Sequence, residues 1–337
     1  MLKVLVTGAS GFVGSHAVEA LMQQTDIQLV AAARDKHRVL AGFTGEIRCG
    51  DIRDAGYITE LVKDVDVIVH AATWSSLFGH KQQSHELFYQ PTIKLIDAAK
   101  QAGVKRFINI STTSAAAPEH SAEANSHGIK RGFWPHLCNL IEVEEYLREQ
   151  AGADHRFSVV NLRLGIFAGQ RYGLGILPIL LPRLKTHLVP WIAGGRTSLP
   201  LIDGRDIGQA ITKAVTVEEL NGFEGINVVG PVKPTVREVI EFLNTEFGYP
   251  TPHFSVPFWI AYPFAGLMEK LNPLSPFDPL VTRSIVHLLE ETSATNDKAS
   301  RVLGYQPQYH WQDAIRLQVN EMQQRQIKAM PMACPIH

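Results

Sequence analysis

The sequence has no excess of charge of either sign, because 32 lysines and arginines are matched by 33 aspartates and glutamates among 337 residues, giving a formal net charge of −1. Without a basic balance there is no electrostatic reason to expect a nucleic acid or an anionic membrane surface as a partner. We therefore expect the partner to be a small molecule or a second copy of the chain.

Cysteine is also scarce. The chain has only Cys49, Cys138 and Cys334, which are far apart and share no Cys-x-x-Cys spacing. This pattern favours neither a disulfide framework nor a zinc or other metal site, and it fits a reducing compartment. No charged leader precedes the first apolar strand, so we expect a soluble, cytoplasmic protein without a signal peptide.

Long apolar runs are missing as well. The two most apolar stretches, residues 174–181 and 257–268, are too short and too often interrupted by proline to span a bilayer, so we expect no transmembrane segment. The second stretch reads PFWIAYPFAGLM. We expect it to be part of the core or of a pocket wall, with a membrane-facing lip as the alternative.

What the sequence does contain is a regular alternation of short apolar runs and amphipathic stretches. Helices are expected at 16–24, 91–102, 137–150 and 235–247, and strands at 4–6, 27–33, 47–52, 65–72, 106–110, 157–164 and 225–229. This alternation predicts an α/β fold with a Rossmann-type, doubly wound parallel sheet and right-handed crossovers. Between residues 165 and 190 glycines and prolines interrupt an apolar segment, which we expect to form loops that line a pocket.

The strongest functional signal is LKVLVTGASGFVG at residues 2–14, where three glycines spaced three apart follow a strand and precede a helix. Gly8 permits a sharp turn, Gly11 lets a ligand approach the backbone, and Gly14 lets the helix pack closely on the strand. Free N–H groups at such a helix start bind a pyrophosphate. The motif favours a dinucleotide site, with a purely structural turn as the alternative. We expect the site to be formed by Thr7, Gly8, Ser10, Gly11, Phe12, Val13 and Gly14.

Residues at the ends of the following strands are expected to contact the rest of the nucleotide. About twenty positions beyond the glycines, an acid binds the ribose 2′-hydroxyl of NAD and a base binds the 2′-phosphate of NADP. Arg34, with Lys36 and Arg38 nearby, favours NADP, whereas the adjacent Asp35 favours NAD. A merely solvated charged loop is an equally good interpretation. Further contacts are expected from Asp51, Ile52, Ala71, Ala72 and Thr112.

Two other polar features lie at strand ends. The hydroxyl cluster STTS at 111–114 follows the fifth strand, where open α/β sheets bind their ligands. His70 closes the fourth strand and is a candidate for proton transfer, although a single histidine there is more often a hydrogen-bonded core residue.

In this order the motifs resemble the extended short-chain dehydrogenase/reductase superfamily, also called the NAD-dependent epimerase/dehydratase family. The similar pieces span nearly the whole chain: TGASGFVG at 7–14, GDIRD at 50–54, VIVHAA at 67–72, GVKRFINIST at 103–112, NLRLGIFAG at 161–169, LIDGRDIGQAI at 201–211 and LGYQP at 303–307. The C-terminal part, with PFWIAYPFAGLMEKL and LVTRSIVHLL, is most similar to the 3β-hydroxysteroid dehydrogenase branch, whose substrates are large and apolar. We expect a dinucleotide-binding domain at 1–165 with 201–230, and a mostly helical substrate lobe at 166–200 with 231–330.

The catalytic residues that the resemblance implies are not all present. The family uses a serine or threonine, a tyrosine that exchanges the substrate proton, a lysine that lowers the pKa of that tyrosine, and often an asparagine that holds a water. Thr112 matches the first, but Trp134 stands at the tyrosine position, Cys138 at the lysine position and Phe88 at the asparagine position. The indole N–H of a tryptophan cannot replace the acidic hydroxyl of the tyrosine, and a thiol cannot replace the positive charge of the lysine. This pattern is most similar to the atypical members, which keep TGxxGxxG and lack the tetrad.

Two hypotheses about function follow. The first is an NAD(P)-dependent oxidoreductase or related enzyme that acts on an apolar substrate with Thr112 and a substitute proton donor. His127, Lys130, His136 and Tyr172 are candidate donors near the expected cleft, although each is more often an exposed loop residue. The second is a catalytically silent protein that senses NAD(P) or holds an apolar ligand. A weaker third is a structural homodimer subunit that pairs through the helix at 137–150, as members of the resembled family do.

Overall fold

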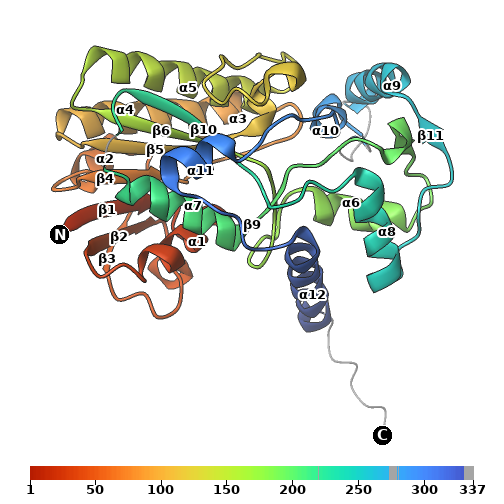
Figure 1. The fold of residues 1–337 in the computed structure, drawn as a ribbon, viewed down its shortest axis with the longest axis horizontal. Coiled ribbons are helices and arrows are strands. Elements are labelled where there is room, and N and C mark those ends of the chain that lie inside the picture. The colour runs from red at the N-terminus through yellow and green to blue at the C-terminus, as the bar shows by residue number, and fades with distance from the viewer. Residues whose placement is uncertain (219, 273–278, 280, 330–337) are drawn as a thin grey trace, which may run out of the picture.

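A computed structural model of the chain describes residues 1–218, 220–272, 279 and 281–329. Its centre is a sheet of 7 parallel strands in the order β10-β6-β5-β4-β1-β2-β3 (Figure 1). The strands are β1 (Leu2–Thr7), β2 (Ile27–Ala33), β3 (Glu46–Cys49), β4 (Val67–His70), β5 (Arg106–Thr112), β6 (Ser158–Leu164) and β10 (Phe223–Val228). This order confirms the predicted Rossmann-type, doubly wound fold.

Helices cover both faces of the sheet. On one face α1 (Phe12–Leu21), α7 (Gly204–Thr216) and α11 (Asp297–Leu303) pack on alternate strand residues such as Val4 and Val6. On the other face α2 (Ala55–Leu61), α4 (Gln90–Gln101) and α5 (Pro135–Ala153) bury the intervening residues, such as Leu5. Because both faces are buried, the strands are nearly continuous apolar runs, as a parallel sheet requires.

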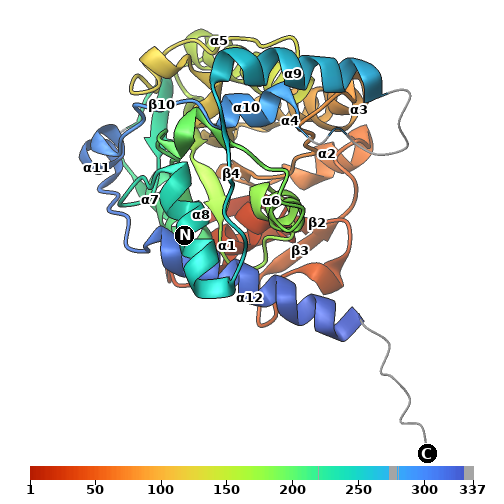
Figure 2. The same cartoon turned by 90° about the vertical axis from the view of Figure 1, so that its right-hand side faces the viewer.

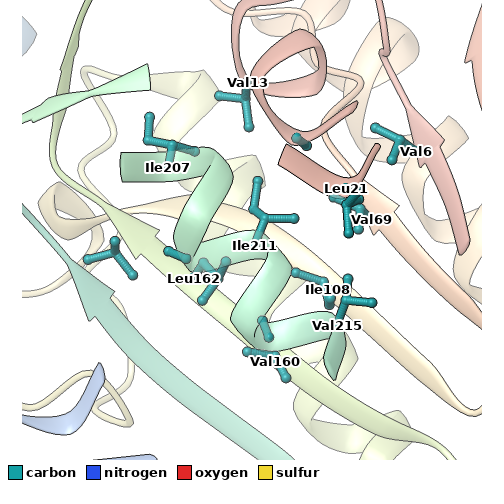
Figure 3. Packing of buried hydrophobic residues seen from close by; sticks show 14 of the residues in the cluster. Val6, Val13, Leu21, Val69, Ile108, Val160, Leu162, Ile207, Ile211 and Val215 are labelled. Atoms are coloured by element: carbon teal, nitrogen blue, oxygen red, sulfur yellow. The ribbon is translucent and has the colours of Figure 1, made fainter. Parts of the chain in front are cut away.

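The first helix is held tightly against α7. Figure 3 shows side chains of both helices gathered over the central strands: Val13, Leu21, Ile207, Ile211 and Val215 above Val6, Val69, Ile108, Val160 and Leu162. The two helices approach closely because α7 carries a glycine at the crossing, and a Cβ at Gly208 would lie 2.5 Å from the carbonyl oxygen of His16. This packing fixes the position of α1 and of its first turn.

The end of the third strand differs from the prediction. We expected this strand to run to residue 52, but β3 ends at Cys49. The chain turns there, and the ring of Tyr57 packs so closely on Gly50 that a Cβ at this position would lie 2.3 Å from the ring. The Asp51 carboxylate stabilises the turn by accepting a hydrogen bond from the Arg53 N–H at 2.9 Å. Asp51 and Ile52 therefore lie in a loop at the carboxyl end of the sheet.

The chain after β6 also forms mostly helical elements outside the central sheet, which we call the lobe. They are β7 (Ile166–Ala168), α6 (Ile176–Leu184), β8 (Trp191–Ile192), α8 (Val236–Phe247), β11 (Ser255–Val256), α9 (Phe258–Leu271), α10 (Arg283–Leu288) and α12 (Trp311–Ala329). The short β9 (Leu201–Asp203) pairs with β7. In the other part of the chain, the short α3 (Lys81–Ser84) and a π-helical turn (His85–Tyr89) precede α4.

The expectation of loops between residues 165 and 190 was wrong where α6 forms. Pro178 does not prevent this helix, because it lies in the first turn, where a backbone N–H has no partner within the helix. The buried side of α6, formed by Leu177, Leu181 and Leu184, joins the core of the lobe. The proposed domain limits themselves remain a prediction.

The apolar stretch at 257–268 is in the core on one side only. It forms most of α9, and on this helix Trp259 is 75% exposed, Phe264 52% and Leu267 53%. On its inner side α9 buries Ala261, Ala265 and Glu269 and packs Phe258 and Tyr262 on a core cluster. The expectation of a core position therefore holds for the inner side of the helix and was wrong for its outer side.

Among the residues that the structure describes, no helix combines the length and the hydrophobicity needed to cross a bilayer. Cys49 and Cys138 are not joined in a disulfide. Cys334 lies outside the described residues.

Candidate functional site

The glycine-rich turn after β1 is packed backbone against backbone. Gly8 has a φ of +66°, in the left-handed region, and a Cβ there would lie 2.6 Å from the N atom of Ala72 at the end of β4. A Cβ on Gly14 would lie 2.1 Å from the carbonyl oxygen of Gly8. Only glycine satisfies both positions, so the first turn of α1 lies directly on the carboxyl ends of β1 and β4.

Gly11 differs from the other two glycines. It precedes α1 with a φ of −84°, its own N–H donates to the carbonyl oxygen of Gly8 at 2.8 Å, and no side chain caps the helix. A Cβ on Gly11 would meet only that same carbonyl oxygen, at 3.2 Å. The helix start is therefore open, and its amides with the positive end of the helix dipole face a space that suits an anion.

This opening lies where the strand order reverses, between β1 and β4, the point at which doubly wound sheets bind ligands. Ala71 and Ala72 follow β4 at that point and are only half-buried. Thr7 and His70 lie beneath them: the His70 ring bonds Thr7 at 2.9 Å and Thr92 at 3.1 Å, and burial lowers its pKa to about 4. His70 is thus a neutral, fully hydrogen-bonded core residue, the second of the two interpretations above.

The residues expected at the adenosine end lie at the tips of β2 and β3. Arg34 is exposed, and the carboxylate of Asp35 accepts a hydrogen bond from the N–H of His37 at 2.9 Å. The Asp51 carboxylate is bonded by the Arg53 guanidinium at 2.6 Å, which holds the pKa of Asp51 below its usual value. Because the Asp35 carboxylate is hydrogen-bonded within its own turn, Arg34 is the freer of the two side chains to contact a substituent of the ribose.

Trp134 and Cys138, the residues expected at the tyrosine and lysine positions, lie on either side of the start of α5, and Trp134 forms an apolar wall with Ala115 and Leu137 near the end of β5. Trp134 is buried and donates its indole N–H to the carbonyl oxygen of Ser76 at 2.9 Å. The thiol of Cys138 donates to the carbonyl oxygen of Arg131, and burial raises its pKa. The Oγ1 of Thr112 accepts a hydrogen bond from the N–H of Ser114 at 3.2 Å. Of these three side chains, none combines the acidity and the charge of a tyrosine and lysine pair.

The other proposed proton donors are not brought together. His136 is buried against Phe88, and burial lowers its pKa to about 4, so it is not the exposed loop residue that we considered more probable. Lys130 pairs with Glu145 at 3.0 Å and with Glu142 at 3.5 Å. His127 is exposed. The Tyr172 ring packs on Phe12 with centroids 4.5 Å apart, and burial raises its pKa to about 12.

A different polar cluster, from the C-terminal lobe, lies beside Trp134. The ring nitrogen Nδ1 of His287 lies 2.7 Å from a carboxylate oxygen of Glu290, and the Tyr262 hydroxyl donates to the other oxygen at 2.6 Å. The second ring nitrogen, Nε2, lies 3.2 Å from the carbonyl oxygen of Ser114, so both ring nitrogens of His287 face acceptors and a neutral ring donates to one of the two. Burial alone would raise the pKa of Glu290, but the hydrogen bonds from His287 and Tyr262 outweigh it and lower that pKa.

The His287 cluster reaches the end of β5 from far along the chain. The ring of His287 packs edge-on to the Trp134 ring with centroids 6.2 Å apart. A cavity of about 30 Å³ lies there, with Thr113, Ser114, Ile166, Pro200, His287 and Glu290 among its lining residues. The sequence reasoning missed this cluster because His287 and Glu290 form only an ordinary helical i, i+3 pair, which carries no catalytic pattern.

A buried ion pair fixes α5 to the sheet beneath this region. Arg163 on β6 is 1% exposed and Glu144 on α5 is 2% exposed, and their charged groups approach to 2.6 Å. The same carboxylate accepts hydrogen bonds from Ser111 at 2.5 Å and from Asn161 at 2.8 Å. The network holds α5, and with it Trp134 and Cys138, against the ends of β5 and β6.

Comparisons with known proteins agree with this fold. The chain is 22% identical over 311 residues to a 4-hydroxy-2-methyl-3-oxo-4-farnesyl-3,4-dihydroquinoline-1-oxide ketoreductase of Stigmatella aurantiaca, covering 90% of this chain and 92% of the relative. It is 24% identical over 335 residues to 3 beta-hydroxysteroid dehydrogenase type 7 of Rattus norvegicus, covering 93% of each. The predicted resemblance to 3β-hydroxysteroid dehydrogenases is thus confirmed.

Among solved structures, a UDP-glucose-4-epimerase from Stenotrophomonas maltophila with bound NAD and formylated UDP-arabinopyranose superposes with a TM-score of 0.75, at 18% identity, over 98% of this chain and 100% of that one. A Thermus thermophilus UDP-glucose 4-epimerase in complex with NAD gives a TM-score of 0.66 at 20% identity, over 96% and 99%. These likenesses show the fold. The model of the NAD dependent epimerase/dehydratase family matches residues 4–229, and the chain therefore belongs to that family.

Proposed function

We propose that this protein is an NAD(P)-dependent oxidoreductase that acts on an apolar substrate without the tyrosine and lysine pair of its family. The open start of α1 at Gly11, above the close contact of Gly8 with Gly14 and Ala72, carries this proposal, since its free amides suit a pyrophosphate. The apolar wall at Trp134 supports an apolar substrate. The printed names of two relatives, a ketoreductase and a hydroxysteroid dehydrogenase, support the same class of reaction.

The residues that would hold the nucleotide follow the turn. The backbone from Ser10 to Gly14 would bind the pyrophosphate, Ala71 and Ala72 would lie against the nucleotide, and Asp51 with Ile52 would border the adenine. Thr112 lies at the end of β5, where the nicotinamide end is expected. When bound, the cofactor supplies the hydride.

Arg34 supports NADP over NAD. Replacing Arg34 with alanine should weaken NADPH binding by about tenfold or more, because a guanidinium bonded to a phosphate is a charge-assisted pair, and should leave NADH binding within about threefold. Calorimetric titration of both nucleotides measures the change, with Arg156→Ala, a change at a 92% exposed side chain, as the control. Equal losses for NADPH and NADH in the Arg34 variant would mean that Arg34 does not select NADP.

A proton for the substrate oxygen must come from a group outside the family's relay. We assign it to His287, because its ring lies beside Trp134 and its two nitrogens face the Glu290 carboxylate and the Ser114 carbonyl oxygen. In a reduction, His287 would give a proton to the oxygen of a ketone bound at the end of β5, and that oxygen would become the hydroxyl of the alcohol. Thr112 would hold the same oxygen.

Replacing His287 with glutamine should lower the turnover of NADPH with an apolar ketone by about 100-fold, in the range expected for losing a general acid. The affinity for NADPH should stay unchanged, because His287 lies outside the glycine turn. A panel from small cyclic ketones to 3-oxosteroids, followed by NADPH fluorescence, is the measurement, and the exposed His127→Gln is the control. Thr112→Ala should also lose turnover. Undiminished turnover in the His287 variant would remove this residue from the reaction.

The second candidate function is a catalytically silent protein that senses NAD(P) or holds an apolar ligand. Trp134, Cys138 and Phe88 favour it, because aromatic side chains and a thiol occupy all three relay positions. It predicts that NADPH raises the melting temperature through mass action while no ketone of the panel is reduced. Turnover of any ketone, lost in the His287 or Thr112 variant, would exclude it.

Three further expectations are also proposals. These are the division into a nucleotide-binding domain and a substrate lobe at the limits given above, pairing of two copies through the segment 137–150 of α5, and a cytoplasmic location.

A further inference from the structure

Helix α9 is apolar on its inner and on its outer side. Inward it buries Ala261 at 4% exposure, Ala265 at 0% and Glu269 at 7%, and it packs Phe258 and Tyr262 on the same core cluster. Its exposed residues are also bulky: Trp259, Ile260, Pro263, Phe264, Leu267 and Leu271, together with Lys270. An ordinary surface helix of a globular protein exposes a polar side, and a helix that is apolar all round is ordinarily buried. The exposed apolar side of α9 indicates that its outer face has a partner of its own.

The outer residues form one continuous stripe. Ile260, Phe264, Leu267 and Leu271 are spaced by four, three and four positions, which places them above one another on the helix surface. Trp259 flanks the stripe at 75% exposure, the highest value among them. Phe254, 48% exposed, precedes the helix in the chain. We call these six residues the α9 face.

The charged residues of α9 leave one exposed cation and no exposed acid on this helix. No lysine, arginine, aspartate or glutamate occurs between residues 254 and 268. The one acid of the helix, Glu269, is turned inward, where its carboxylate binds the Arg283 guanidinium at 2.6 Å and the Arg283 N–H at 2.7 Å. Lys270, at the end of the stripe, is the only exposed charge on α9. A face with one cation and no anion meets no repulsion from lipid phosphates.

The α9 face lies at the rim of the lobe, away from the sheet. Figures 1 and 2 show α9 at the outer edge of the molecule, with α10 packed beneath it. Because α10 is on the inner side, no helix or strand that the structure describes covers the exposed side chains of the outer side.

We propose that the α9 face seats the protein on the surface of a phospholipid bilayer, with the helix lying in the interface and not crossing it. Tryptophan belongs at the level of the headgroups, and a lysine at the end of an apolar stripe extends its ammonium group to them. A helix of this kind binds lipid by burying its apolar side into the boundary between headgroups and acyl chains.

The size of the α9 face favours lipid over a second copy of the chain. An aromatic side chain buries about 150–250 Å² and these residues are only half-exposed, so the face offers on the order of 500 Å², short of the roughly 800 Å² per partner of a stable interface. A bilayer needs no such complementary area. The nearly neutral chain also offers little electrostatic attraction, so the contact rests on apolar burial.

One consequence rests on the proposed function. Tyr262 of α9 bonds Glu290, and α9 packs on α10, which carries His287. An apolar substrate dissolved in the bilayer would thus be taken up next to the proposed proton donor. The membrane contact itself does not depend on this.

The test is flotation of the full chain with vesicles of pure phosphatidylcholine, without nucleotide or substrate. The chain should float with the vesicles, and the double variant F264E/L267E should bind about tenfold more weakly or worse, because two charges would enter the apolar boundary. The control variant L174E/V232E adds the same charges at exposed apolar residues of other segments, Leu174 at 69% and Val232 at 48%, and should float like the original chain.

A second measurement does not depend on the charged variant. Tryptophan fluorescence should be quenched by brominated phosphatidylcholine, and W259F should lose most of this quenching, since Trp134, Trp191 and Trp311 are buried and Trp74 is half-buried against the core that α2 and α4 cover. Binding should persist at about 0.5 M NaCl, where charge attraction is screened. The proposal is overturned by failure to float, by equal binding of both double variants, by binding that salt abolishes, or by a dimer in light scattering that F264E/L267E separates. None of these outcomes changes the result expected in the ketone assay. The proposed membrane contact and the proposed oxidoreductase function can therefore be contradicted independently of each other.

Discussion

Replacing Gly11 with valine is expected to weaken the binding of NADPH and NADH by about 100-fold or more while changing the free energy of unfolding by no more than about 1 kcal/mol. The φ of Gly11, −84°, suits any residue, and a Cβ there meets only the carbonyl oxygen of Gly8, at 3.2 Å. The fold accommodates the side chain when that carbonyl oxygen shifts by a few tenths of an ångström. The phosphates do not, because the valine methyl groups occupy the space in front of the helix amides.

The control for this prediction is Gly152→Val, the same change at an exposed position of α5 where a Cβ meets nothing within 4 Å. Gly14→Ala is a poor substitute, because its Cβ would lie 2.1 Å from the carbonyl oxygen of Gly8 and would disturb the packing of α1. Titration calorimetry gives the affinities and urea unfolding gives the stability. Unchanged affinity in a folded Gly11 variant would mean that the turn is structural only.

Replacing Glu144 with alanine is expected to lower the free energy of unfolding by about 3–5 kcal/mol, the range for breaking a buried ion pair by removing one partner. Arg163, 1% exposed, would be left charged without its carboxylate. Ser111 and Asn161 would lose an acceptor at the same time. Because unpaired buried groups keep their full desolvation penalty, the loss should exceed that of any surface ion pair.

Glu145→Ala is the matched control for Glu144→Ala, since it is the next residue of the same helix and its pair with Lys130 is exposed on both sides. That change should cost less than about 1 kcal/mol. Urea unfolding measured by circular dichroism compares the two variants directly. Losses of the same size would show that the Glu144 network contributes no more than a surface pair.

The sheet and the glycine turn were predictable because their signals are local. Apolar runs such as 27–33 and 157–164 are long enough to specify buried strands, and β2 has the predicted limits. The turn at Gly8 needs a left-handed residue and the helix start needs a close approach, so residue type and spacing carry the geometry. That no tyrosine of this chain is followed by a lysine four residues later is likewise plain from the sequence, whereas the loss of the family's catalytic pair stays a prediction.

The features that escaped prediction depend on tertiary contacts. His287 and Glu290 acquire a neighbour at the end of β5 only when the lobe folds against the sheet, more than 170 residues away along the chain. Glu144 looks like one more surface acid of a helix until β6 brings Arg163 against it. The exposure of the outer side of α9 could not be predicted from hydrophobicity, because the same composition suits a buried and an exposed stripe.

The most direct test of a dinucleotide site at the start of α1 is a calorimetric titration of the unmodified chain with NAD, NADH, NADP and NADPH, side by side. We predict that one nucleotide per chain binds with a dissociation constant on the order of micromolar, that is about −8 kcal/mol, and that NADPH binds more tightly than NADH. No heat of binding from any of the four at millimolar concentration would contradict the account.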